Sequence, residues 1–346
     1  MKKDILDYAF TELKDNIRKL GYPSYRAGQM FEWLYGRKVS AFSDMKNLPH
    51  ELREKLAEEF FIGRLAAEER VSSKEGCDKF LFRLKDGSFI ESVLIPAGER
   101  RTLCLSTQVG CRFACPFCAS GKMGFKRNLR TSEITGQITG AQKTEIRRIT
   151  NVVFMGMGEP LDNLDNLIKA IYIMSNPKGF AMGARRITVS TCGLPEGIRA
   201  IGRIPIPVNL SISLHASYDK LRDELVPANR IYPLKELLAA CREYLEEGNR
   251  KITLEYALIK DKNISKRDAS ALIKIAKRLR AKVNLIPLSR VEGSEAVPPS
   301  ARQTADFRRT LKEAGVPVTL RRSEGGDINA ACGQLAGKRP VTGRRE

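Results

Sequence analysis

The segment with the clearest capacity for chemistry is a run of three cysteines, Cys111, Cys115 and Cys118. Gaps of three and two residues bring three thiols onto one loop, and thiolates at such spacing can hold three irons of a four-iron cluster. No fourth ligand follows locally, so one iron could keep an open coordination position, as reactive metal sites do. Structural zinc is the alternative, with His50, His215 or a distant cysteine as its fourth ligand.

The remaining composition narrows the class of protein. Eight cysteines among 346 residues are too sparse for the disulfide framework of a small secreted domain. The first seven residues include both lysines and aspartates, and they lack the apolar core of a secretory leader. No apolar run approaches the length of a bilayer span. We therefore expect a soluble, cytoplasmic protein without a membrane partner, and a monomer by default.

The charge balance is strongly basic. Lys and Arg number 60 against 40 Asp and Glu, which gives a formal net charge of +20. Basic pairs recur along the chain, for example at Lys126-Arg127 and Arg185-Arg186. This excess favours a polyanionic partner such as RNA, DNA or an anionic membrane surface, although a generally basic, solubilising composition is the alternative.

The elements that must position the cysteines begin after two smaller pieces. Helical periodicity over 5–20, 25–35 and 49–61 predicts a small N-terminal helical accessory domain, residues 1–62. Two strand patterns follow, Lys79–Leu84 and Phe89–Pro96, and the turn between them contains Asp-Gly. We expect a β-hairpin extension over 63–97.

From residue 98 to 335, strand patterns alternate with helical patterns, which include 132–145, 164–175, 234–247 and 266–280. This rhythm is typical of parallel strands joined by right-handed crossovers, so the sequence predicts an α/β fold with a partial (β/α)6 barrel, open on one side. A final helix over 301–314, a strand over 316–322 and a basic tail over 336–346 complete the chain. The six predicted barrel strands are 102–107, 151–156, 186–191, 208–215, 252–259 and 282–288.

Unusual residues follow these strands where each one ends. In parallel α/β barrels the carboxyl ends of the strands meet on one rim and carry the chemistry, so we expect a single active site there. Taken singly each signal is weaker: a buried histidine is more often a core residue, and serines often cap helices. The strand-end segments are the three-cysteine loop, Gly156–Pro160, Ser190–Gly193, Ser213–His215 and Leu288–Ser289.

Several blocks of the sequence resemble one protein family. The pattern Cys-x-x-x-Cys-x-aromatic-Cys, with Phe117 as the aromatic, resembles the signature of the radical S-adenosylmethionine (SAM) superfamily. Residues 102–111, 156–161, 213–216 and 327–335 are similar to the RlmN/Cfr family of radical SAM RNA methyltransferases. The similarity covers nearly the whole chain, and Pro160 favours the RlmN branch.

The resemblance implies a radical-SAM barrel whose three cysteines hold a [4Fe–4S] cluster, with SAM bound at the open iron. It implies methylation of carbon-2 of adenosine in the peptidyl-transferase region of 23S rRNA and beside the anticodon in tRNA. A flavodoxin-type protein would donate the electron. Ser289 departs from the asparagine usual in the family, so that contact is the weakest. The implied SAM contacts are Gly158, Glu159, Ser190, Ser213, Leu214, His215 and Ser289.

The family resemblance also implies a methyl carrier. Cys332 would be methylated by one SAM, a second SAM would generate the radical, and Cys104 would release the product by forming a disulfide with Cys332. Glu91 would accept the proton lost from the purine. No family role falls on the other cysteines (Cys77, Cys192 and Cys241), and we expect them to pack in the core. Two alternatives remain open: methylation at carbon-8, as in the Cfr branch, and a non-enzymatic nucleic-acid-binding protein with structural metal.

Overall fold

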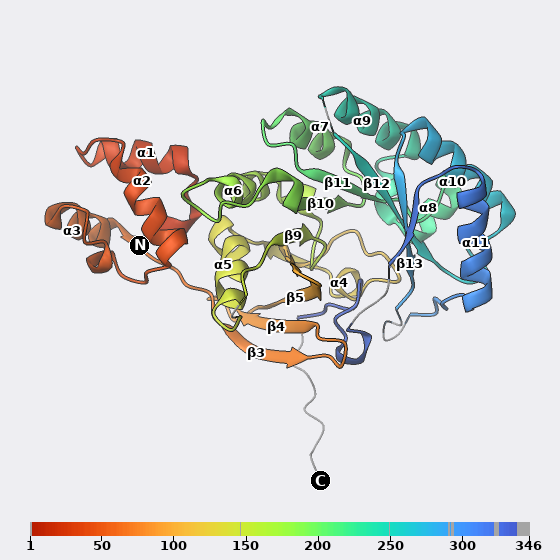
Figure 1. The fold of residues 1–346 in the computed structure, drawn as a ribbon, viewed down its shortest axis with the longest axis horizontal. Helices are drawn as coiled ribbons and strands as arrows, with labels where there is room; N and C mark the ends of the chain where they lie inside the picture. The colour runs from red at the N-terminus through yellow and green to blue at the C-terminus, as the bar shows by residue number, and fades with distance from the viewer. Residues whose placement is uncertain are drawn as a thin grey trace, which may run out of the picture.

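The computed structural model describes residues 2–145, 147–248, 250–289, 291, 294–321 and 325–337. A helical lobe, red in Figure 1, precedes a larger α/β body. The lobe contains η1 (Ile5–Asp7), α1 (Phe10–Lys19), α2 (Arg26–Phe31), the π-helical turn η2 (Glu32–Arg37), η3 (Phe42–Asp44) and α3 (His50–Glu59).

The first helix starts later than the sequence pattern predicts. A single helix was expected over 5–20, but β1 (Lys3–Asp4) pairs with β2 (Phe60–Phe61), and α1 follows a short 3-10 turn. The Asp4 carboxylate accepts the N–H of Leu6 at 3.1 Å, which favours the turn over a continued helix. A side chain that caps locally can thus interrupt an otherwise helical pattern of apolar residues.

Several contacts join the lobe to the body, and two of them also cover or cap parts of the body. The Asp7 carboxylate accepts the backbone N–H of Ser132 at 2.8 Å, in the first turn of α5 (Thr131–Gln142). The rings of Tyr35 and Phe180 lie 5.4 Å apart. The lobe therefore supplies both a cap and an apolar cover to the larger body.

Ten strands of the described residues form one sheet in the order β14-β13-β12-β11-β10-β9-β6-β5-β4-β3. From β6 to β14 all neighbours are parallel, which confirms the predicted barrel of six strands and adds β14 as a seventh. The parallel strands are β6 (Arg100–Cys104), β9 (Asn151–Phe154), β10 (Ile187–Thr191), β11 (Asn209–Ser213), β12 (Ile252–Leu258), β13 (Lys282–Pro287) and β14 (Val318–Leu320).

The predicted hairpin forms as β4 (Asp78–Arg83) and β5 (Phe89–Ala97). A further strand, β3 (Ala67–Ser72), pairs with β4 and was not predicted, because half of its residues are charged. β5 also pairs with β6, with Val93 opposite Cys104, so the hairpin continues the barrel sheet. This join brings the hairpin close to the first barrel strand and its cysteine.

Helices lie along the outside of the curved sheet (Figure 1). The sequence patterns locate most of them, but α7 and α8 were not predicted, because both are short and lie among Gly, Pro and charged residues. The connecting helices are α5, α6 (Leu164–Ser175), α7 (Pro195–Arg203), α8 (Asp219–Leu225), α9 (Leu234–Glu246), α10 (Lys266–Arg278) and α11 (Ala301–Glu313).

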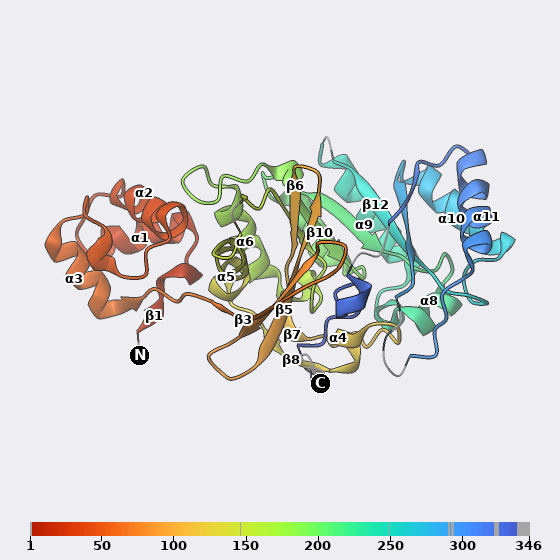
Figure 2. The same ribbon diagram turned by 60° about the horizontal axis from the view of Figure 1, so that its bottom comes forward.

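Shorter elements lie near the strand ends. Figure 2 shows the dark blue C-terminal segment beside α4 and the β5–β6 hairpin. Among the residues described, no helix is long and apolar enough to cross a membrane. The short elements are β7 (Gln108–Gly110), α4 (Ala119–Lys122), β8 (Phe125–Asn128), η4 (Pro160–Asn163), η5 (Ala184–Arg186), η6 (Pro227–Arg230) and η7 (Gly326–Ile328).

Candidate active site

A cavity of about 970 Å³, partly open to solvent, lies at the carboxyl ends of the parallel strands. Residues from five separate strand ends and from the C-terminal segment meet here, as the barrel geometry predicts. Among the residues singled out from the sequence, its walls include Cys111, Cys115, Cys118, Gly158, Glu159, Ser190, Ser213, His215, Ser289 and Cys332.

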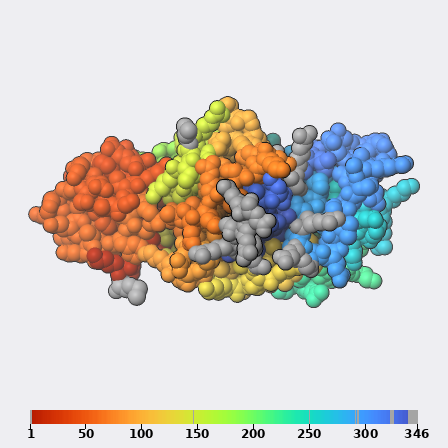
Figure 3. All heavy atoms as spheres, turned by 90° about the horizontal axis from the view of Figure 1, so that it is seen from below, coloured from red at the N-terminus to blue at the C-terminus, as the bar shows by residue number. Residues whose placement is uncertain are grey.

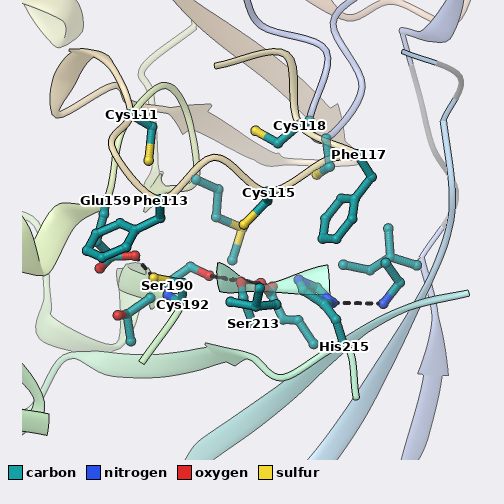
Figure 4. A pocket seen from close by; sticks show the side chains of 18 of the residues that line it. Cys111, Phe113, Cys115, Phe117, Cys118, Glu159, Ser190, Cys192, Ser213 and His215 are labelled. Carbon is teal, nitrogen blue, oxygen red and sulfur yellow. Dashed lines mark hydrogen bonds between the residues drawn. The ribbon is translucent and has the colours of Figure 1, made fainter. Parts of the chain in front are cut away.

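The three-cysteine loop is folded between β7 and β8, which pair with each other. The Cys111 N–H donates to the Gly124 carbonyl at 3.1 Å and closes the neck of the loop. Ala114 adopts a left-handed backbone conformation (φ 49°), which turns the chain between the first two cysteines. Figure 4 shows Cys111, Cys115 and Cys118 facing the strand ends that carry Ser190 and His215.

Burial is the main influence on the three thiols. It raises the pKa of Cys111 to about 12 and those of Cys115 and Cys118 above their usual range, and the neighbouring thiols add to the effect. Thiols in such a place ionise when a metal takes up their charge. In the described part of the chain they stand apart and do not converge on a single ion. Cluster ligation needs one cysteine at each of three irons, and this donor set fits that requirement.

Glu159 is held at the cavity wall by backbone groups. Its carboxylate accepts the N–H of Cys192 at 2.8 Å and that of Leu161 at 3.0 Å. Gly158 precedes it with φ 94°, and an added Cβ would lie 2.4 Å from the Gln108 side chain, so only glycine fits. Burial raises the pKa of Glu159, and the backbone donors oppose that shift. The carboxylate is thus placed to accept hydrogen bonds from a bound ammonium group.

His215 is a neutral, fixed imidazole. Its Nδ1 accepts the backbone N–H of Ala257 at 3.0 Å, so the remaining proton lies on Nε2. Burial, together with the cation of Arg222, lowers its pKa to about 3. The ring meets that of Phe117 edge to face, with centroids 5.2 Å apart. The aromatic residue of the cysteine motif therefore packs directly on the end of β11.

Leu214 does not line the cavity. It is fully buried behind it, and its N–H donates to the carbonyl of Glu255 at 3.0 Å. Any contact from this residue to a ligand would come from its backbone.

Glu255 on β12 was missed by the sequence reasoning. Its Oε2 accepts the hydroxyl of Ser190 at 2.8 Å and that of Ser213 at 3.4 Å, and the residue lines the cavity. Burial raises its pKa, while the nearby cation of Arg321 opposes the shift. The sequence did contain a signal for a functional role of Glu255: it is the one acidic residue in a mostly apolar strand, and buried acids are rare without a partner.

Arg222 on α8 was missed as well. It is fully buried, and its guanidinium donates to the carbonyls of Cys192 and Leu214 and, at 2.8 Å, to the side chain of Asn229. It thereby ties the ends of β10 and β11 together under the cavity. Nothing in the local pattern of α8 distinguishes it from an exposed helical arginine.

Replacing Arg222 by methionine should lower the free energy of unfolding by about 3 kcal/mol, because several buried acceptors lose their donor at once. Urea unfolding followed by circular dichroism measures this change. The matched control is Arg309→Met, which removes an exposed pair with Asp306 and should cost less than about 0.5 kcal/mol. Equal losses in the two variants would contradict the assigned role of Arg222.

A second cavity adjoins the first. Cys104 and Cys332 both line it, together with Arg321, and the two cavities share Cys118 and Met155 as walls. Burial, together with the neighbouring Cys332, raises the pKa of Cys104 to about 12. Cys332 thus faces the three-cysteine loop on one side and Cys104 on the other.

Glu91 lines neither cavity. It lies on β5, on the same strand face as Val93 and Ile95, which do line the second cavity. The Glu91 carboxylate is instead directed to Lys79 and to the backbone of the C-terminal segment. The three remaining cysteines, Cys77, Cys192 and Cys241, are buried; Cys192 also lines the first cavity.

Comparisons with known proteins agree with this geometry. A family model described as the radical SAM superfamily matches residues 105–272. A second, described as the N-terminal domain of ribosomal RNA large subunit methyltransferases, matches residues 3–62.

Curated relatives match over most of their length. The chain is 46% identical over 323 residues to a probable dual-specificity RNA methyltransferase RlmN of Akkermansia muciniphila. That match covers 91% of this chain and 90% of that protein. It is 44% identical over 333 residues to the dual-specificity RNA methyltransferase RlmN of Syntrophobacter fumaroxidans, covering 96% and 97%. The crystal structure of a radical SAM methyltransferase from Sphaerobacter thermophilus superposes with a TM-score of 0.90 at 41% identity, covering 97% of this chain and all of that one.

Proposed function

The chain belongs to the RlmN family of radical SAM RNA methyltransferases, and on that premise we propose that it methylates carbon-2 of adenosine. It is an RNA methyltransferase of a superfamily that uses a [4Fe–4S] cluster and SAM. As substrates we propose an adenosine in the peptidyl-transferase region of 23S rRNA and the adenosine next to the anticodon in tRNA. The net charge of +20 supports a polyanionic substrate.

One observation carries the proposal. Cys332 lines the cavity that holds the three-cysteine loop, and it also lines the adjoining cavity that holds Cys104. A thiol in that position can take up a carbon on one side and meet a second thiol on the other. A module that only binds nucleic acid needs neither thiol.

The first cavity supplies the groups that SAM binding needs. The three loop cysteines would hold the cluster, which supplies the electron that splits SAM and gives a carbon radical. Glu159 would accept hydrogen bonds from the SAM ammonium group, and Gly158 lets the backbone approach it. His215 offers an Nε2 proton, while Ser190 and Ser213 offer hydroxyls; Ser289 also lines the cavity.

The chain itself carries the methyl group. The Cys332 thiol attacks the methyl carbon of one SAM: an S–C bond forms, the sulfonium S–C bond breaks, the thiol proton leaves, and S-adenosylhomocysteine departs. Before the carbon on Cys332 can add to the purine it must lose one hydrogen atom, and the carbon radical from a second SAM would take that atom. We therefore propose two SAM molecules per turnover.

Cys104 would release the product. Its thiolate would attack the sulfur of Cys332, so that an S–S bond forms and the carbon–sulfur bond breaks. The carbon leaves with the electron pair of that bond and takes up a proton to become the methyl group on the RNA. An external dithiol then reduces the disulfide. Glu91 as the acceptor of the purine proton stays a prediction from the family resemblance. A flavodoxin-type electron donor, a monomeric state and a cytoplasmic location complete the proposal.

Nucleoside mass spectrometry tests the assignment. Digested rRNA and tRNA from cells with and without this chain should differ in 2-methyladenosine, which disappears when the chain is absent. Loss of 8-methyladenosine instead would overturn the carbon-2 assignment. Anaerobically purified protein that contains zinc and neither iron nor sulfide would overturn the radical chemistry.

Release by Cys104 should accelerate as pH rises. The pKa of this thiol is raised to about 12 by burial, so it is almost wholly protonated at neutral pH, and only the thiolate attacks. Its ionised fraction should grow about tenfold per pH unit between roughly pH 7 and pH 9. The decay of the protein–RNA adduct in a single turnover, followed on denaturing gels, measures this slope. A flat profile would contradict the expected ionisation of Cys104.

A further inference from the structure

The segment that carries Cys332, residues 325–337, lies across the surface between the hairpin and the three-cysteine loop. Figure 3 shows it in dark blue beside the orange residues of the hairpin. We propose that Glu91, paired with Lys79, is a positioning residue that fixes the C-terminal end of this segment and thereby the place of Cys332. The importance of that position rests on the function proposed above, in which Cys332 carries the methyl group.

The contacts of Glu91 carry this inference. One carboxylate oxygen, Oε2, accepts the backbone N–H groups of Ala336 at 2.7 Å and Gly337 at 2.9 Å. The other, Oε1, lies 3.2 Å from the ammonium nitrogen of Lys79. Glu91 is only 2% exposed, so each contact is made away from bulk water. Hydrogen bonds to a buried, charged acceptor are stronger than those between neutral groups.

The backbone at Gly337 is shaped for this docking. Its φ is 57°, and an added Cβ would lie 2.6 Å from the Phe89 carbonyl on β5. The amide at this position can therefore reach Glu91 only because the residue has no side chain. The close fit indicates a specific docking of the segment on β5.

Other anchors hold the segment on either side of Cys332. At its start, the Gly325 N–H donates to the Glu75 carboxylate at 2.8 Å. Nearer the thiol, the Ala119 N–H donates to the Gly333 carbonyl at 2.7 Å, and the Ser120 hydroxyl donates to the Leu335 carbonyl at 2.6 Å. The last two donors belong to α4, directly after the cysteine loop. The segment that carries Cys332 is thus anchored by hydrogen bonds to the β3–β4 turn, to α4 and to β5.

This arrangement bears on the role that the family resemblance gives to Glu91. A general base must offer a free oxygen to the proton that it removes. Both oxygens of Glu91 are engaged, Oε2 by the segment that carries Cys332 and Oε1 by Lys79. A proton on Oε2 would compete with the two backbone N–H groups that hold the segment. Positioning is therefore the role that the geometry supports directly.

Hydrogen–deuterium exchange on the anaerobically purified full-length chain tests the proposal. Glu91→Gln should speed exchange in peptides that contain Ala336 and Gly337 by about tenfold, because their charged acceptor is lost. Lys79→Met should act in the same direction. The matched control is Glu75→Gln, which should speed exchange near Gly325 and leave the 336–337 amides as they were. Unchanged exchange at 336–337 in both Glu91→Gln and Lys79→Met would overturn the proposal.

A second readout separates positioning from general stability and from proton transfer. Methylation of Cys332 by SAM in the absence of RNA, followed by peptide mass spectrometry, should slow about tenfold in Glu91→Gln and recover in Glu91→Gln combined with Lys79→Gln, where two amides can pair. A Glu91 that serves only as base would leave this step and the exchange unaltered, which would overturn positioning. If the unsubstituted chain never methylates Cys332, the proposed function fails. The exchange comparison then still shows whether Glu91 anchors residues 336–337.

Discussion

The Cys332→Ser variant is expected to make no methylated RNA, with activity at least about a thousandfold below that of the unsubstituted chain. The hydroxyl of serine is a far weaker nucleophile than a thiol and cannot form the disulfide that releases the product. Cys332 faces the first cavity, but the variant leaves the three loop cysteines and Glu159 in place. Reductive cleavage of SAM should therefore continue without methyl transfer.

Two assays check this result side by side. Nucleoside mass spectrometry measures methyladenosine, and chromatography of 5′-deoxyadenosine measures SAM cleavage. The control is Cys241→Ala, since Cys241 is buried in α9 and lines neither of the two cavities; it should retain methylation. RNA methylation by Cys332→Ser at more than a few per cent of normal would remove Cys332 from the carrier role.

The Cys104→Ala variant is expected to stop after one turnover, with RNA covalently attached to the protein. Attack on the purine needs only Cys332 and the first cavity, whereas release needs a second thiol. Cys104 and Cys332 are the two cysteines, apart from Cys118, that line the second cavity among the residues described. Cys118 is one of the three loop cysteines that would be bound to iron. No other thiol there would be free to replace Cys104.

The adduct should be visible as a shifted band on a denaturing gel that nuclease treatment removes. The Cys104→Ala, Cys332→Ala double variant is the matched control, and it should give no shifted band because the carrier is gone. Multiple turnovers by Cys104→Ala would show that another group releases the RNA, and the proposed disulfide step would be wrong.

Much of the fold was predictable because its signals are local. The three-cysteine loop, the strand patterns that lead to Ser190 and His215, and the alternation with helices are all properties of short windows. The rule that parallel strands present their carboxyl ends together then brings distant segments to one cavity. Strand β3 was not predicted, because half of its residues are charged and none of them is fully buried.

The missed residues depend on contacts far apart in the sequence. Glu255 matters because Ser190 and Ser213 donate to it from two other strands. Arg222 matters because it donates to carbonyls at the ends of both β10 and β11. Neither residue has a neighbour in sequence that reveals its partner. Glu91 illustrates the same limit: strand alternation gives its face, but its position along β5 directs it to the C-terminal segment.

The hydrogen bond from Ser132 to Asp7 and the ring contact of Tyr35 with Phe180 have a practical consequence. A trimmed protein that begins at the barrel would leave the first turn of α5 without its acceptor and an aromatic surface open to water. Weak RNA binding by such a fragment would then have two explanations, a lost contact to nucleic acid or a loosened scaffold. Point changes on the outer surface of the lobe, in the intact chain, would separate them.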